Sequence, residues 1–399
     1  MKLIIPTNWD DDLINVARRP EVHAVYGKLD RDFVGGGRPS SMFGRVSRKT
    51  AAAHIARLKA ENKKFYYLLN SACLGNREWT ISGNRRLNGL LDWISSAQAA
   101  GIAVASPYLA QYARKNYPAL ELSASVLAGV NSVEKAKYWE GLGASVITLN
   151  HTELNRDFRL LEKIRKNVKC ALQLLVNDNC LLNCPLFSYH HNVIAHASQT
   201  SESLGRYTFD YCRLTCRQMM LADTTNFIKA AWIRPEDLKA YEDIGIDHFK
   251  LVDRTMNTES LERATAAYAS RSYKGNLFDL FTNTSRLNWS KVSGFSHKFK
   301  YYFHPLSLNV FRLFGKRGVA KDLEVHIDNS KLDGFIEFFR NNDCRSMACS
   351  ECGYCAKIAD KAVRIEPGHR KEMLGIHDGF LSEIISGDIL RYWPRTPKK

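Results

Sequence analysis

Short apolar runs alternate with amphipathic segments along the first 275 residues, and this alternation limits the fold more than any other feature. The runs are rich in Val, Ile, Leu and aromatic residues and have the lengths of β-strands. They are 3–6, 23–26, 65–69, 102–106, 120–126, 145–149, 170–176, 230–233 and 248–252. Helical patterns lie between most of them, among them 48–62, 86–100, 132–142, 154–167 and 235–244. Strands separated by helices predict a parallel sheet of repeated strand–helix units.

The number of these units favours one α/β architecture. About eight units in roughly 270 residues predict a (β/α)8 TIM-like barrel, with a doubly wound sheet as the alternative. The glycine fingerprint of dinucleotide-binding sheets is missing, because Gly141-Leu-Gly143 follows a helix and lacks the third glycine. We therefore predict a barrel catalytic domain over residues 1–275 and a smaller C-terminal cysteine-containing extension over residues 276–399.

Eight of the ten cysteines fall into three tight groups, which indicates metal binding. The groups are Cys180/Cys184, Cys212/Cys216 and Cys344/Cys349/Cys352/Cys355. Residues three or four positions apart share a helix face, so each group can aim its thiolates at one centre. The N-terminus does not read as a secretory signal and there is no apolar stretch of membrane-spanning length, so we expect a cytoplasmic protein without a membrane span. In a reducing compartment such cysteines are more often ligands than disulfides.

The cysteine groups predict two metal sites. Four soft thiolates on Cys180, Cys184, Cys212 and Cys216 suit a [4Fe-4S] cluster, and a closed zinc site is the alternative. Cys73 follows a predicted strand and is an alternative ligand at the same site. The tail cysteines, Cys344, Cys349, Cys352 and Cys355, have the close spacing of ferredoxin ligands. They could hold a second cluster that relays electrons, or a zinc ion that stabilises a small domain.

Polar residues follow several predicted strands, where the active site of a barrel would lie. They include Asn70, Asn150 and His151, Asn177 and Asp178, and Lys250, Asp253 and Arg254. Arg38 ends a Gly35-Gly36-Gly37 loop whose backbone could aim N–H groups at an anion, or could simply form a tight turn.

The net charge of +16 favours a polyanionic partner; the alternative is that the charge only keeps the protein soluble. Residues 280–321 contain no Asp or Glu and interleave basic with aromatic side chains. This pattern suits single-stranded nucleic acid, through phosphate pairing and base stacking, and RNA is our first expectation. A β-rich appendage whose aromatics face its own core fits the same pattern equally well.

These motifs together resemble the collagenase-like peptidase family U32. The resemblance rests on Tyr26-Gly27 with the Gly35–Arg38 loop, on residues 67–76, on the paired central cysteines, and on residues 245–254. It implies a barrel-like catalytic domain, a [4Fe-4S] cluster on four cysteines, and oxygen-independent hydroxylation of RNA bases or of the ubiquinone ring. It also implies prephenate as an oxygen donor in the RNA branch. The peptidase branch has a glutamate and a Gly-Ala-rich approach to its first cysteine, whereas Val176-Asn177-Asp178-Asn179 stands here, so the substrate does not carry over.

The resulting hypothesis is an iron–sulfur-dependent enzyme that hydroxylates, or modifies by related redox chemistry, an RNA base or an aromatic small molecule. Arg38, Lys250 and Arg254 would hold an anion, Asn70 and Asn150 would orient it, and Asp253 or His151 would move protons. An electron donor is required, and a paralogous subunit is a further expected partner. A collagenase-like peptidase and a non-catalytic, zinc-stabilised RNA-binding protein are the alternatives.

Overall fold

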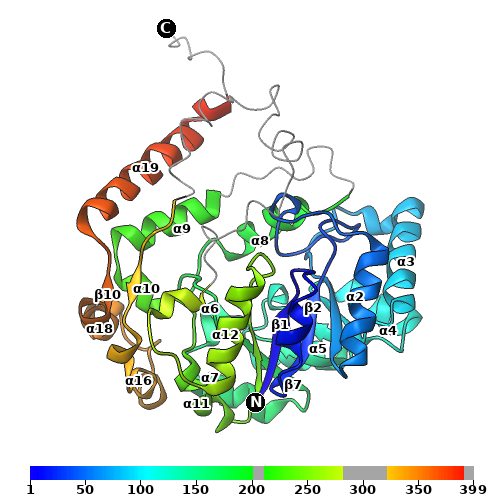
Figure 1. Ribbon diagram of the computed structural model, residues 1–399, viewed down its shortest axis with the longest axis horizontal. Helices are drawn as coiled ribbons and strands as arrows, with labels where there is room; N and C mark the ends of the chain where they lie inside the picture. Colours follow the sequence, from blue (N-terminus) through cyan, green and yellow to red (C-terminus); the bar gives the residue numbers. More distant parts are fainter. Residues whose placement is uncertain (201–210, 282–320, 391–399) are drawn as a thin grey trace.

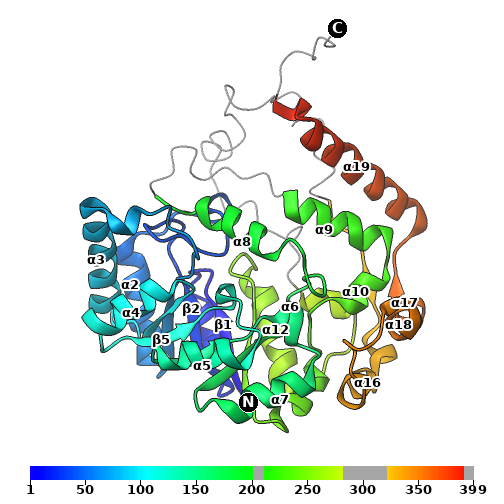
Figure 2. The same cartoon turned by 180° about the vertical axis from the view of Figure 1, so that it is seen from behind.

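The computed structural model, which describes residues 1–200, 211–281 and 321–390, contains a closed barrel of eight parallel strands (Figures 1 and 2). The strands pair in sequence order, and β1 closes the barrel against β8, with Ile4 opposite Lys250. This confirms the predicted (β/α)8 TIM-like fold. The strands are β1 Lys2–Pro6, β2 Val22–Gly27, β3 Lys64–Leu69, β4 Gly101–Val104, β5 Glu121–Ala124, β6 Ala144–Thr148, β7 Ala171–Leu175 and β8 His248–Lys250.

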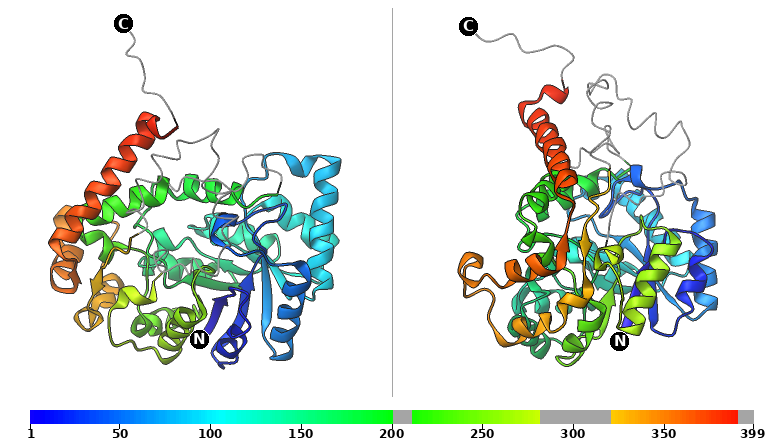
Figure 3. Two further views of the ribbon diagram at one scale, coloured as in Figure 1. Left: turned by 45° about the horizontal axis from the view of Figure 1, so that its top comes forward. Right: turned by 60° about the vertical axis from the view of Figure 1, so that its left-hand side comes forward.

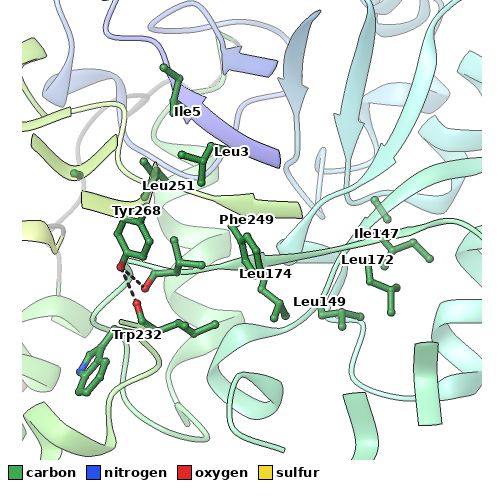
Figure 4. Packing of buried hydrophobic residues seen from close by; sticks show 14 of the residues in the cluster. Leu3, Ile5, Ile147, Leu149, Leu172, Leu174, Trp232, Phe249, Leu251 and Tyr268 are labelled. Carbon is green, nitrogen blue, oxygen red and sulfur yellow. Dashed lines mark hydrogen bonds between the residues drawn. The ribbon is translucent and has the colours of Figure 1, made fainter. Parts of the chain in front are cut away.

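Alternate residues of each strand face the two sides of the barrel wall, as the period of a β-strand requires. Leu3 and Ile5 join the large cluster between the strands and the surrounding helices, whereas Ile4 joins a small cluster inside the barrel. Figure 4 shows part of the large cluster, where Tyr268 donates its hydroxyl to the carbonyls of Val176 and Ile233 at 3.1 and 2.7 Å. The buried residues on both faces of the strands therefore determine where each strand ends and its loop begins.

The surrounding helices begin at side-chain caps that the sequence supplies, except the short helix Leu13–Ala17, which has no side-chain cap. Ser47 accepts from the amide of Thr50 at the start of one helix, and Thr80 accepts from Gly83 at the start of the next. The helix predicted over residues 154–167 begins later, at Phe158, where the Asp157 carboxylate caps it by accepting from the amide of Leu160; Leu154 is the last residue of a separate short helix. These helices are α1 Leu13–Ala17, α2 Arg48–Ala60, α3 Ile81–Ser96, α4 Pro107–Asn116, α5 Val133–Gly141, α6 His151–Leu154, α7 Phe158–Asn167 and α12 Thr258–Ser270.

A long insertion separates β7 from β8. It carries α8 Phe187–His196, α9 Tyr211–Ala222, α10 Thr225–Lys229 and α11 Leu238–Glu242. The strand predicted over residues 230–233 is wrong. This segment is buried and bonds the chain just after β7, with Ile233 N donating to Val176 O at 2.8 Å, but it forms no strand of the barrel. Its apolar side chains, such as Trp232, instead pack beneath the C-terminal extension.

The extension lies against the barrel beside this insertion (Figures 1 and 3). Its elements are β9 His326–Ile327, α16 Phe335–Asn341, α17 Cys349–Cys352, α18 Tyr354–Ala362, β10 Val363–Arg364 and α19 Pro367–Ser386. Helix α19 runs along α9, and Arg370 donates to the carbonyls of Leu221 and Ala222 at 2.6 and 2.8 Å. Leu214 of α9 packs in one cluster with Phe380 and Leu381 of α19.

One expectation concerns residues outside the described chain, and another can be checked only within it. Nearly all of the basic aromatic segment, residues 282–320, lies outside the described residues, so its predicted contact with RNA stays a prediction. Within the part of the chain that the structure describes, no helix has the length and apolarity needed to cross a membrane.

Candidate functional site

A pocket opens at the C-terminal ends of the barrel strands, where a TIM-like barrel places its active site. Six of the seven residues predicted as catalytic line it. These are Arg38, Asn70, His151, Lys250, Asp253 and Arg254, joined by Tyr26, Ser125, Asp178 and His191 among others. The site therefore draws on the ends of six strands, β2, β3, β5, β6, β7 and β8, and on helix α8 of the insertion.

The glycine loop after β2 positions Arg38 at this pocket. Gly35 has a φ of +79°, and a Cβ there would lie 2.6 Å from the carbonyl oxygen of Ala195, so only glycine fits comfortably. The amide of Gly35 donates to the Asp32 carboxylate at 2.6 Å, and that of Gly36 donates to the Ser198 hydroxyl at 2.8 Å. Since these two amides already have protein acceptors, the loop acts at this point as a tight turn.

Arg38 and Asp253 form the ion pair at the centre of the pocket. Arg38 Nε lies 2.5 Å from Asp253 Oδ2, and the Asp253 side chain is 2% exposed. Burial works against the charged guanidinium, but the charges of Asp253 and Asp178 outweigh it and raise the pKa of Arg38. The arginine is thus a fixed cation whose direction Asp253 sets.

Two further cations lie beside this pair. Burial, reinforced by the charge of Arg254, lowers the pKa of Lys250 to about 7. Its Nζ lies 4.0 Å from the centre of the Tyr26 ring, and Arg254 Cζ lies 4.5 Å from that of Phe43. Lys250 can therefore gain or lose a proton near neutral pH, which a general acid or base must do.

The two asparagines predicted to orient a substrate are placed differently. Asn70 donates to the Ser125 hydroxyl at 3.1 Å, while its buried Oδ1 has no hydrogen-bond partner among the described residues. A ligand that donates a hydrogen bond would satisfy this oxygen. Asn150 instead caps α6: its Oδ1 accepts from the backbone amide of Thr152, and its amide donates to Glu153 at 2.6 Å. The structure leaves Asn150 outside the pocket lining.

His151, Asp178 and Cys180 form a compact group at the edge of the pocket. One ligand atom from each lies within 4.8 Å of the others, and His151 Nε2 is 3.2 Å from Asp178 Oδ2. Burial alone would raise the pKa of Asp178, but the hydrogen bond and charge of His151 lower it. Within the described chain, the buried Nδ1 of His151 has no hydrogen-bond partner. A carboxylate, an imidazole and a thiol in this arrangement are a donor set for a metal ion.

The predicted barrel ligands come from two places. Cys180 and Cys184 lie in the loop after β7, and Cys212 and Cys216 are one turn apart on α9. Burial raises the pKa of Cys180 well above its usual value, and the charges of Asp178, Cys184 and Cys216 add to this rise. The thiols of Cys180, Cys184 and Cys216 therefore interact electrostatically, and a bound cation would offset the mutual repulsion of their thiolates. Cys73 is exposed in the loop after β3, and its role as a ligand stays a prediction.

The tail cysteines surround a second cavity, of about 370 Å³, where the extension meets the barrel. Cys344, Cys349 and Cys355 line it from the extension. Burial raises the pKa of Cys344, and the charges of Cys349 and Cys352 raise it further, so the fourth cysteine lies close by as well. The four tail cysteines thus gather at one place.

Sequence reasoning left three pocket residues, Asp178, His191 and Ser125, without a role. Asp178 was recognised as following a strand, but its pairing with His151 depends on loops after two different strands. His191 of α8 reaches the pocket from the insertion, and burial lowers its pKa well below its usual value. Ser125 follows β5 and could have been found by the strand-end rule that found Asn70.

Several known proteins are similar to this chain in sequence or in structure. A protein of Methanocaldococcus jannaschii described as an uncharacterized protease is 28% identical over 354 residues, which is 88% of this chain and 92% of the relative. A solved U32 peptidase structure is 20% identical, with a TM-score of 0.48 over 63% of this chain and 93% of that chain. A thiamine phosphate pyrophosphorylase from Pyrococcus furiosus is 13% identical, with a TM-score of 0.37 over 68% of this chain and 94% of that chain. Because the sequence profile of peptidase family U32 matches residues 41–276, more than half of its length, the chain belongs to that family.

Proposed function

We propose that this protein is an enzyme that binds a small anionic group at the barrel mouth and modifies a substrate there by redox chemistry beside a cysteine-bound iron–sulfur cluster. The observation that carries the proposal is the convergence of Arg38, Lys250 and Arg254 in one buried pocket next to Cys180. Buried cations without enough carboxylates to neutralise them favour an anion, because it restores the charge balance. Asp253 directly pairs only the first of these cations.

The donor set at the barrel cysteines fits this cofactor. Cys180, Cys184, Cys212 and Cys216 would hold a [4Fe-4S] cluster, because cysteine thiolates are the ligands that such clusters take; Cys212 is buried and the other three are partly buried. When bound, the cluster would supply an electron carrier or a Lewis acid. The nearby Arg38 lowers the electrostatic cost of placing thiolates at Cys180.

The chain's own residues would divide the remaining work. Arg38, aimed by Asp253, and Arg254 would bind the two oxygens of a carboxylate. Asn70 would accept a hydrogen bond from the substrate through its unsatisfied Oδ1. Lys250, with a pKa of about 7, would deliver or take up the proton that the modification requires.

The resemblance narrows the class of anion to be tested. Members linked to RNA hydroxylation use prephenate as oxygen donor, and a dicarboxylate of that kind suits a pocket with three cations. We therefore propose oxygen-independent hydroxylation as the reaction class, with RNA as the first substrate to test. The electron donor and a paralogous subunit remain predicted partners.

A peptidase is the second candidate, and the His151–Asp178–Cys180 group favours it. A single divalent ion held by these residues would activate a water molecule for peptide hydrolysis. The family name and the relative described as a protease point in the same direction.

Anaerobic purification separates the two candidates. The Cys180→Ser/Cys216→Ser variant should lose about four irons per chain relative to the unmodified protein, the content of one cubane cluster. Cys170→Ser is the matched control, because Cys170 lies before β7 at the opposite end of the barrel. Iron content unchanged in the double variant, together with peptide cleavage that His151→Ala abolishes, would overturn the redox proposal in favour of the peptidase.

A further inference from the structure

The cavity between the extension and the barrel has the properties of a second metal site. Cys344, Cys349 and Cys355 line one side of it, and Arg156 and Lys229 of the barrel line the other. Cys352 lies at the end of α17, the short helix that begins at Cys349. The site therefore combines three lining thiols and the adjacent Cys352 of the extension with a barrel wall that carries three cations, Arg156, Arg159 and Lys229, and two carboxylates, Glu153 and Asp157.

The space and charge of this site distinguish between a single ion and a cluster. A zinc ion bound by four thiolates at about 2.3 Å fills its own coordination sphere and needs no cavity. A cubane cluster needs room for its irons and sulfides, and the cavity provides about 370 Å³. Four thiolates around a cubane also leave a net negative charge. The lining carries four cations (Arg156, Arg159, Lys229 and Arg345) and three carboxylates (Glu153, Asp157 and Asp343), so its excess positive charge would offset part of that negative charge.

Aromatic packing holds this site in place. The Arg156 guanidinium lies 4.9 Å from the ring centre of Phe335 and 5.2 Å from that of Phe339, both on α16. It donates to the carbonyl oxygens of Ile228 and Ala230 at 2.6 and 2.7 Å, which fixes its direction. Tyr354, the neighbour of Cys355, stacks on Phe338 of the same helix with ring centres 3.9 Å apart. The cysteine segment is thus docked on the barrel.

The same cavity reaches the loop that carries the barrel cysteines. Leu182 and Asn183, which lie between Cys180 and Cys184, line it. The amide of Asn183 donates to the carbonyl of Thr152 at 2.9 Å, which anchors the loop to α6. Since Cys184 follows Asn183 directly, one peptide unit separates a residue lining the cavity from a barrel cysteine.

We propose that Cys344, Cys349, Cys352 and Cys355 bind a second [4Fe-4S] cluster in this cavity, and that it passes electrons to the barrel site across the 180–184 loop. The relay rests on the proposed function, whereas the binding of the cluster does not. Each transfer moves one electron and no proton: the tail cluster is oxidised from a 1+ to a 2+ core, and the barrel cluster is reduced from 2+ to 1+. A one-electron donor protein of the ferredoxin or flavodoxin class would reduce the tail cluster again.

The binding is tested by anaerobic reconstitution of the full-length protein with ferrous iron and sulfide. The unmodified chain should hold about eight irons, and the Cys349→Ser/Cys352→Ser variant about four, as expected for two cubanes and one. Cys170→Ser should keep the full content. An unmodified chain with about four irons and a stoichiometric zinc that the tail variant loses would overturn the second cluster.

The relay is tested by electron paramagnetic resonance after reduction with dithionite. Two nearby reduced clusters should give a broadened, spin-coupled signal, and the tail variant should give the simple signal of one cluster. Signals of the unmodified protein that equal the sum of the two single-site variants would refute the relay. The Cys180→Ser/Cys216→Ser variant distinguishes a failure of the proposed function from a failure of this inference. If it holds as much iron as the unmodified chain, the proposed barrel cluster is refuted, whereas the proposed tail cluster is not.

A variant that keeps every cysteine guards against misfolding. Lys229→Gln removes one positive charge from the cavity lining, so the reduction potential of the tail cluster should fall while that of the barrel cluster stays unchanged. Circular dichroism should confirm an intact fold. Equal shifts at both clusters, or no shift at either, would contradict the placement of the tail cluster beside Lys229.

Discussion

Replacing Lys250 with methionine should stabilise the protein, by an amount that depends on pH. Burial lowers the pKa of Lys250 from 10.5 to about 7, and the side chain has no carboxylate partner among its described contacts. At about 1.4 kcal/mol per pKa unit, keeping this lysine charged in the folded protein costs about 5 kcal/mol. Methionine has a similar length and no charge, so Lys250→Met removes this cost.

The sign of the pH dependence follows from proton binding. Because the folded-state pKa is the lower one, the unfolded chain binds more protons between pH 7 and 10.5, and the contribution of Lys250 to stability rises with pH across that range. The gain from Lys250→Met should therefore be about 4 kcal/mol at pH 7, about 2 kcal/mol at pH 9, and close to zero above pH 10.5.

Urea unfolding followed by circular dichroism at pH 7 and pH 9 measures this difference. Lys28→Met is the matched control, because Lys28 is equally buried but lies 2.9 Å from Asp32. Removing that partner leaves a buried carboxylate unpaired, so the control should lose about 3 kcal/mol. A loss of stability in Lys250→Met, or a gain that is the same at both pH values, would refute the reasoning.

Three further outcomes are expected. Arg38→Met should leave the buried Asp253 carboxylate without its ion-pair partner and lower the free energy of unfolding by about 3 kcal/mol. Isothermal titration calorimetry should also show that the variant no longer binds prephenate. Unchanged prephenate binding would show that Arg38 is not part of the binding site. Prephenate binding to the unmodified protein should weaken as the pH rises above about 7, where Lys250 loses its proton, and a pH-independent affinity in titrations from pH 6 to 9 would contradict this. Gly35→Ala should lower the thermal midpoint and weaken prephenate binding, because the added Cβ meets the Ala195 carbonyl at a positive φ. Gly89→Ala is the control: its Cβ would have open space inside α3, so binding should be unchanged and the thermal midpoint should rise slightly, because alanine favours the helix more than glycine does.

The sequence was a good guide to the fold because barrel strands are marked by local patterns. Short apolar runs identified residues 3–6 and the other barrel strands, and amphipathic patterns identified helices between them, although the predicted helix 86–100 starts later than the observed Ile81–Ser96. The same pattern was misleading at residues 230–233, where the apolar side chains are buried against the extension instead of in a sheet. A β-strand and a buried extended loop have similar amino-acid compositions, and only hydrogen bonding to a neighbouring strand distinguishes them.

The candidate site was predictable only in part, because its geometry depends on loops distant in sequence. The strand-end rule placed Asn70 and Lys250 at the barrel mouth, yet it could not separate them from Asn150, whose side chain caps a helix. A residue that follows a strand can face the pocket or the next helix, and both need polar side chains. Nor does any local signal show that Asp178 meets His151, since that contact joins two different loops.

The contact between α19 and α9 has a consequence for how this chain can be shortened or recombined. The family match ends at residue 276, but α9, which bears Cys212 and Cys216, packs Leu214 against Phe380 and Leu381 of the extension. A chain cut at the family boundary would expose this apolar contact and free the helix that carries half of the predicted barrel ligands. The extension is thus a built-in scaffold for the barrel centre, and the two parts would have to be inherited together.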